Sequence, residues 1–116
     1  MNICIFSGRA SADAEVKVTQ SGKKVARVRL AVDGIGKDAK AQFFDLIMWE
    51  GRADVAERFI QKGKEITVRA HANTRSYEAQ DGSKRYVTEY IVDELKLHGA
   101  KSAEKNNNGG DEEIPF

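Results

Sequence analysis

The stretch KKVARVRLAV, residues 23–32, alternates between apolar and other side chains with a period of two residues. Ala26, Val28, Leu30 and Val32 fall on one face, and Arg27 and Arg29 fall on the other. This alternation is typical of a β-strand that buries one face and exposes the other. The stretch therefore predicts a strand whose exposed face is cationic.

Strand patterns recur along the rest of the chain. Residues 42–49 and 65–77 alternate in the same way, and residues 84–97 are rich in the β-branched and aromatic residues that strands favour. Residues 2–8 read as an opening strand that continues to Val18 through a bend. Gly beside Ser or Asp marks the turns between these segments. The chain is thus predicted to be mostly β-sheet.

Residues 51–63, GRADVAERFIQKG, break the period of two. Val55 and Phe59 lie four residues apart, as do Ala56 and Ile60, which predicts an amphipathic helix of about two to three turns ending at Gly63. Three strands, a helix and two strands fit an all-β OB-fold: a five-stranded Greek-key barrel with one short helix between strands three and four. An open meander sheet with one covering helix has the same element order and stays an alternative.

Length, charge and cysteine use set the broad class of the protein. A chain of 116 residues has room for one domain. Residues 1–98 carry 17 Lys and Arg against 14 Asp and Glu, whereas residues 99–116 carry two Lys against four acids. One cysteine cannot form an intrachain disulfide, and no signal peptide or membrane span is recognisable, so we expect a cytoplasmic protein.

We expect three parts in the chain: a globular domain over residues 1–98, a flexible linker over residues 99–110, and an acidic tip over residues 111–116. The linker sequence lacks the apolar side chains that offset the entropy of ordering a chain, so the C-terminal tail is predicted to be disordered.

The sequence carries little that would support catalysis. Its two histidines and one cysteine are far apart, and neither zinc-site spacing nor a phosphate-binding loop is present. We therefore expect no enzyme activity, no metal and no cofactor. Asp111, Glu112 and Glu113 could hold a divalent cation loosely, but a solvated acidic tail is the better interpretation.

The predicted exposed strand faces mix cations with large rings, which suits unpaired nucleic acid. Rings stack on bases, and cations follow phosphates. Alternation alone leaves Phe43 and Trp49 equally compatible with core or subunit-interface positions, and Arg27 and Arg29 with a solvated face. The candidate binding residues are Arg27, Arg29, Phe43, Trp49, Arg69, Arg75, Tyr77, Lys84 and Arg85.

The last six residues, DEEIPF, are either a frayed end or a ligand for another protein. Phe116 can enter an apolar pocket while its terminal carboxylate meets a Lys or Arg. The three acids can steer this tip to a basic surface, and Pro115 lowers its ordering cost. These residues alone leave both interpretations open.

These segments together resemble the bacterial-type single-stranded DNA-binding proteins. The resemblance covers residues 1–98 and the last six. It is carried by the SGKKVARVRLAV strand, the QFFDLIMWEGRADVAERFIQKGKEITV segment, the TRSYEAQDGSKRYVTEYIV hairpin and, most specifically, DEEIPF. Hairpin residues 33–40 hold no aromatic residue, so a fourth stacking site typical of the family is missing here.

The resemblance implies an OB-fold protein that coats and protects single-stranded DNA in replication, recombination and repair, without sequence preference. It implies that Phe43, Trp49 and Tyr77 stack on bases, and that the chain forms a homo-oligomer, usually a tetramer. Partner proteins would bind the tip, and the short linker points to a phage- or plasmid-borne member acting in the bacterial cytoplasm or an infected host cell. The tip residues are Asp111, Glu112, Glu113, Ile114, Pro115 and Phe116.

The low net charge of residues 1–98 and the missing fourth stacking ring leave a second interpretation open. The chain could be an OB-fold module that binds RNA or protein and has only weak affinity for DNA.

Overall fold

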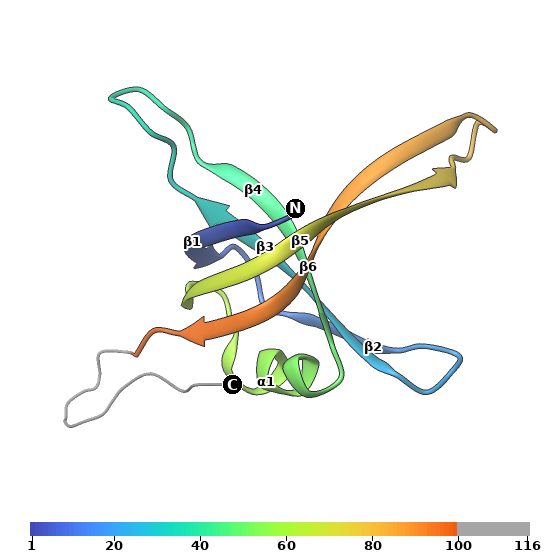
Figure 1. Ribbon diagram of the computed structural model, residues 1–116, viewed down its shortest axis with the longest axis horizontal. Helices are drawn as coiled ribbons and strands as arrows, with labels where there is room; N and C mark the ends of the chain where they lie inside the picture. The colour runs from blue at the N-terminus through green and yellow to red at the C-terminus, as the bar shows by residue number, and fades with distance from the viewer. Residues whose placement is uncertain (100–116) are drawn as a thin grey trace.

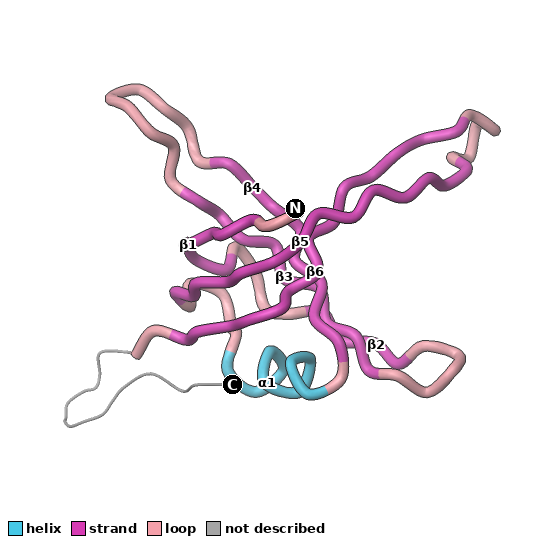
Figure 2. The backbone as a smooth tube through the Cα atoms, viewed as in Figure 1, coloured by secondary structure: helices cyan, strands magenta, loops and turns pink. Residues whose placement is uncertain are grey.

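The computed structural model describes residues 1–99. The expected linker beyond Gly99 and the tip at residues 111–116 lie outside this range. Within it, Figure 2 shows strands that make up most of the fold and one helix that lies at one end of them. The elements are β1 (Cys4–Ala10), β2 (Glu15–Val18), β3 (Lys24–Val32), β4 (Gln42–Trp49), α1 (Gly51–Phe59), β5 (Glu65–Glu78) and β6 (Lys84–Leu97). The prediction of a mostly β protein with one helix between the third and fourth predicted strands is confirmed.

The strands form one sheet in the order β1-β5-β6-β4-β3-β2, and β1 also pairs with β3 (Figure 1). This extra pairing closes the sheet into a barrel, because the first strand contacts both β5 and β3. The pairing of β4 with β6 is parallel, and the other pairings are antiparallel. The closed barrel supports the OB-fold and excludes the open meander.

The predicted opening strand is divided by a bend into β1 and β2. At Arg9 and Ala10 the chain leaves β5 and joins β3, and β2 then pairs with β3 from Glu15 to Val18. The Asp13 carboxylate holds the bend by accepting a hydrogen bond of 2.8 Å from the backbone N–H of Lys62. Five predicted strands therefore become six strand segments without any change in the order of elements.

The alternation of β3 places its apolar side chains in the core, as predicted. Ala26, Val28 and Leu30 are fully buried. Burial of this apolar surface is the main term that stabilises the barrel. The other strands, the helix and the residue that follows it complete the core with Ala10, Leu46, Met48, Ala53, Ala56, Ile60, Ile66, Val68, Val92, Leu95 and Leu97.

The helix α1 has the predicted length of two to three turns, but it ends earlier than predicted, and it lies across one end of the barrel (Figure 1). It ends at Phe59 rather than at Gly63. Gly63 lies in the following turn with φ of 91°, a value that glycine adopts without strain, and its N–H bonds to the Ala10 carbonyl. The buried face of the helix carries Ala53 and Ala56, while Phe59 stays partly exposed.

Two long connections project from the barrel. Figure 1 shows the β5–β6 hairpin and the β3–β4 connection leaving the barrel on the side away from α1. The hairpin is paired from Glu78 opposite Lys84 to Ile66 opposite Leu97, with one register shift between Arg69 and Ala70. The outer faces of β3, β4 and β5 therefore run from the barrel onto these projections.

Candidate nucleic-acid interface

One groove crosses the outer face of five strands, β2 to β6, and we call it the strand groove. Its volume is about 330 Å³. It brings together three of the predicted binding residues, which lie far apart in the sequence. Its lining consists of Glu15, Lys17, Val25, Arg27, Ile47, Trp49, Arg75 and Glu89.

Trp49 forms one wall of the strand groove. It is the last residue of β4, stands opposite Val25 of β3, and leaves 40% of its surface exposed. The core-side neighbour Met48 is fully buried, so the alternation of the strand directs Trp49 outward. A half-exposed indole at the wall of a groove can offer a ring face to a flat, apolar ligand.

The backbone turns sharply just after Trp49. Glu50 has φ of 54° and ψ of −113°, and among residues 1–99 it is the one non-glycine residue with positive φ. Its N–H donates a 2.7 Å hydrogen bond to the Lys24 carbonyl, which ties the turn to β3. The turn between β4 and α1 is thus made by strained backbone beside the indole.

The floor of the strand groove holds a bridged group of two arginines and one glutamate. Arg27 Nη2 donates to Glu89 Oε2 at 2.8 Å, and Arg75 donates through Nε to Oε1 at 3.0 Å and through Nη2 to Oε2 at 3.3 Å. Glu89 is buried, with 7% of its surface exposed, whereas both arginines are exposed. The hydrogen bonds from Arg75 above all, with those from Arg27, lower the pKa of Glu89 although burial opposes this.

Phe43 and Arg29 form a second ring-and-cation pair on the same face of the sheet. The Arg29 Cζ atom lies 4.8 Å from the centre of the Phe43 ring, a cation–π contact. Phe43 is 50% exposed. It precedes Trp49 by six residues on β4, so at about 3.3 Å per residue the two rings stand about 20 Å apart on one face.

The β5–β6 hairpin separates the remaining candidates onto its two faces. Tyr77 is 47% exposed and stands opposite Arg85 in the ladder, two pairs beyond Arg75. Arg85 also bonds to Asp81 and Ser83 in the turn. Lys84 is one residue away and therefore faces the other side, where its Nζ lies 5.9 Å from the centre of the Tyr86 ring.

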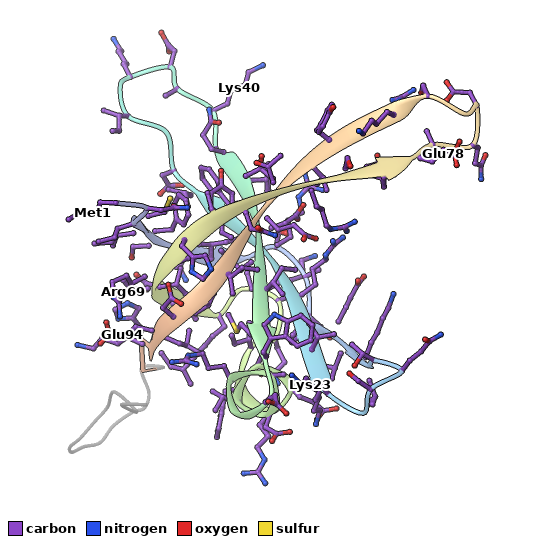
Figure 3. The ribbon with its side chains drawn as sticks, turned by 45° about the vertical axis from the view of Figure 1, so that its right-hand side comes forward. Met1, Lys23, Lys40, Arg69, Glu78 and Glu94 are labelled. Carbon is purple, nitrogen blue, oxygen red and sulfur yellow. The ribbon has the colours of Figure 1, made fainter. Side chains whose placement is uncertain are left out.

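Arg69 does not join the strand groove. It lies opposite Ile5 of β1 and Glu94 of β6, and its Nε donates to Glu94 Oε1 at 3.1 Å. Figure 3 shows Arg69 beside Glu94, at the opposite end of β5 from Glu78. A separate hollow lies here, lined by Ile5, Thr67, Val68, Arg69, Glu94, Leu95 and Lys96.

Sequence reasoning missed Lys17 and Glu89 as groove residues. Lys17 lies on the short strand β2, whose pairing with β3 brings it to the groove. Glu89 lies on the same face of β6 as Ile91, and the sequence analysis assigned no face to this strand. Its partners come from two other strands and leave no local pattern.

Across residues 1–99, no cluster of three or more His, Cys, Asp or Glu side chains could hold a metal ion. No helix in the same range is long and apolar enough to cross a membrane.

Comparison with known proteins places the chain in a family. The model of the single-strand binding protein family matches residues 1–98. A single-stranded DNA-binding protein of Clostridium tetani is 41% identical over 101 residues, which cover 84% of this chain and 70% of that protein. Single-stranded DNA-binding protein 3 of Clostridium acetobutylicum is 34% identical, covering 97% and 81% of the two chains. A single-stranded DNA-binding protein of Streptococcus pneumoniae is 32% identical, covering 95% and 73%.

The family match spans all six strands and the helix, and the relatives align over most of their own length. The closed barrel has the topology that the sequence resemblance implied. The chain belongs to the single-strand binding protein family.

Proposed function

We propose that this protein binds single-stranded DNA without strong sequence preference along the outer face of β3, β4 and β5. One observation carries the proposal: the strand groove combines the half-exposed ring of Trp49 with the cations Lys17, Arg27 and Arg75. Stacking accepts any base, and the cations meet phosphates of any sequence. The names of the similar proteins support the same ligand.

The proposed path of the strand extends beyond the groove in both directions. Phe43 with Arg29 continues it along β4, and Tyr77 with Arg85 continues it along the hairpin. Arg69 and Lys84 were predicted to bind as well, but Arg69 lies beside Ile5 and Lys84 lies on the other face of the hairpin. We therefore assign these two to the edge of the path at most.

The first test is a fluorescence titration of the protein with oligo-dT. Trp49 is the only tryptophan in the sequence, so its emission reports on the groove. We expect strong quenching by oligo-dT, weaker binding as salt rises, and much weaker binding of duplex DNA. Equal affinity for duplex and single strands would contradict the proposal. Tighter binding of RNA than of single-stranded DNA, or binding of a protein without binding of DNA, would favour the alternative of an RNA-binding or protein-interaction module.

We propose that the protein acts by binding rather than by catalysis. It would coat and protect single-stranded DNA during replication, recombination and repair, in the cytoplasm of a bacterium or of a phage-infected host. The short linker supports a phage- or plasmid-borne member of the family. Incubation of labelled DNA with the protein and Mg²⁺ should give no cleavage products, and metal-dependent cleavage would refute a purely binding role.

The tip at residues 111–116 is proposed to recruit partner proteins. The support is chemical: three acids precede an Ile-Pro-Phe sequence whose terminal ring and carboxylate suit an apolar pocket with a basic rim. Deleting these six residues should leave DNA affinity close to that of the full chain and abolish binding to replication and repair proteins. A variant with Phe116→Ala alone should lose most partner binding, while retained binding would refute the docking role.

We also propose that the chain assembles as a homo-oligomer, with a tetramer as the state that the resemblance implies. The exposed apolar side chains Ile3 and Ile5 support this, because a second copy of the chain would cover them. Within residues 1–99, β3 pairs with β1 only at Arg9 and Ala10, so most of this edge of β1 is open to pairing with a second copy. Light scattering should show an oligomer that dissociates in the Ile5→Glu variant. Ile35→Glu, in an exposed loop, is the matched control and should leave the assembly intact.

A further inference from the structure

Two acids, Glu15 and Glu89, line the strand groove, where a phosphate-binding surface would be expected to avoid acids, and only Glu89 is buried. Glu89 is the one buried charged residue among residues 1–99. Its carboxylate lies in the floor of the groove with Ile47, and Trp49 forms the wall beside it. A buried carboxylate is stable only if it is paired and hydrogen-bonded, and here three hydrogen bonds from two arginines satisfy it.

Glu89 is the link between two arginines that the sheet itself does not join. Arg27 lies on β3 and Arg75 on β5, while β4 and β6 lie between these strands in the sheet. Each arginine bonds to the carboxylate of Glu89 from its own side. Without this carboxylate, two long and exposed side chains would sample many rotamers, and binding would have to order them.

The same carboxylate reduces the positive charge that a bound strand meets. Guanidinium groups remain protonated in proteins, so Arg27 and Arg75 carry two positive charges. Glu89 leaves a local net charge of about +1, since its hydrogen bonds lower its pKa and keep it ionised near neutral pH. The bonds to Glu89 use one N–H of Arg27 and two of Arg75, so each guanidinium keeps donors for a nucleotide.

We propose that Glu89 is a positioning and charge-limiting residue of the strand groove. It fixes Arg27 and Arg75 beside Trp49 before the strand arrives, and it neutralises one of their two charges. Binding at this point then depends less on phosphate attraction and more on the ring and on directed hydrogen bonds. This inference rests on the proposed binding of single-stranded DNA in the same groove.

The salt dependence of binding tests the charge-limiting role. Glu89→Gln preserves the shape of the side chain and removes its charge. The slope of log affinity against log salt should steepen by about 0.7, the value for one further charge interaction with a single strand. Affinity at low salt should rise accordingly. A slope equal to that of the unmodified protein, in a variant that melts cooperatively, would overturn the charge-limiting role.

Glu94→Gln is the matched control. It removes one negative charge that is also paired with an arginine, but the pair lies outside the groove, beside Ile5. The net charge of the protein changes equally in both variants. We expect a slope close to that of the unmodified protein for Glu94→Gln. An equal steepening in both variants would show that net charge alone is responsible, and would overturn the proposal.

Glu89→Asp tests the positioning role and keeps the charge. The side chain is one methylene shorter, so it cannot reach both arginines as Glu89 does. We expect the slope to stay unchanged while affinity falls several-fold at every salt concentration. Affinity equal to that of the unmodified protein would overturn the positioning role. This variant decides the question even if Glu89→Gln proves too unstable to purify.

The proposed function and this inference fail in different ways. If the Trp49 emission is quenched by oligo-dT and the Glu89 variants bind with unchanged slope and affinity, only the inference on Glu89 is wrong. If Arg27→Ala and Arg75→Ala both bind as tightly as the unmodified protein, the strand does not use this groove and the proposed path is wrong.

Discussion

Two parts of the outer surface place arginine beside glutamate, and they differ in almost every other respect. In the strand groove, Glu89 is buried and bridges Arg27 and Arg75 beside Trp49. At the other end of β5, Arg69 pairs with Glu94, whose side chain is 65% exposed, beside the aliphatic Ile5. The first arrangement orders cations next to a ring, whereas the second is a solvated ion pair on an apolar face.

The difference shows that charge alone does not mark a binding surface on this barrel. Arg69 and Arg75 lie on the same strand and share its alternation. What separates them is the set of neighbours that other strands contribute. Burial of the acid and the presence of a half-exposed ring are the features that favour nucleic acid in the groove.

Removing the indole should have the largest effect on binding. We expect Trp49→Ala to weaken binding of oligo-dT by about tenfold to a hundredfold, because stacking of one base contributes about 1–3 kcal/mol. Fluorescence anisotropy of a labelled oligonucleotide measures this. Phe59→Ala is the matched control, since Phe59 is 38% exposed but lies on α1 outside the groove lining. Comparable losses in both variants would remove the distinction between the groove and the rest of the surface.

Removing one arginine from each region should lower the free energy of unfolding by different amounts. Arg75→Ala leaves the buried Glu89 with Arg27 as its partner, so we expect a loss of about 2 kcal/mol in the free energy of unfolding. Arg69→Ala removes one arm of an exposed pair and should cost less than about 1 kcal/mol. Urea denaturation of both variants measures the difference, and equal losses would mean that the buried bridge stabilises no more than the exposed pair.

The pH dependence of stability should report the ionisation of Glu89. Arg75 and Arg27 lower the pKa of Glu89 in the folded protein, so its contribution is present above the unfolded-state pKa of about 4.3 and is lost as pH falls through the lower folded-state value. Between pH 6 and pH 3 the unmodified protein should therefore lose more stability than Glu89→Gln. Urea denaturation at both pH values tests this. A Glu89→Gln variant that loses as much stability as the unmodified protein would contradict the prediction.

The smallest expected effect concerns the strained turn that ends the groove wall. Glu50 adopts positive φ, so Glu50→Gly should relieve strain and raise the free energy of unfolding by about 1 kcal/mol. The hydrogen bond from its N–H to Lys24 uses backbone atoms only and should persist. Thermal melting measures the gain. Glu50→Ala is the control, because alanine at this position keeps the strained backbone, and it should show no gain in the free energy of unfolding.

Sequence reasoning predicted the elements well because their signals are local. The alternation in residues 23–32 depends only on the pleat of the strand, and the structure buries Ala26, Val28 and Leu30 as expected. The helix was placed correctly between strands, but its end was drawn at Gly63 instead of Phe59. That error arose because Ile60 turns into the core after the helix has ended, which a period of four residues cannot reveal.

The candidate site was less predictable because its neighbours are not local. Ile47 alternates in phase with the exposed Phe43 and Trp49 on β4, yet it is 7% exposed and lies in the lining of the groove. The nine candidate residues were read as one cationic face with rings. In the structure, Arg27, Trp49 and Arg75 line one groove, and Arg29 lies over Phe43. Arg69 lies beside Glu94, and Lys84 lies beside Tyr86 on the other face of the hairpin.

The order of the elements, the apolar faces of the strands and the rings and cations on the opposite faces could all be predicted from the sequence. These properties follow from side-chain period and turn chemistry within a few residues. Only the folded barrel shows that Glu89 bonds to both Arg27 and Arg75, and that Arg69 lies opposite Ile5. The physical reason is that closure of the barrel sets which strands are neighbours, and the chain separates Arg27 from Glu89 by 62 residues.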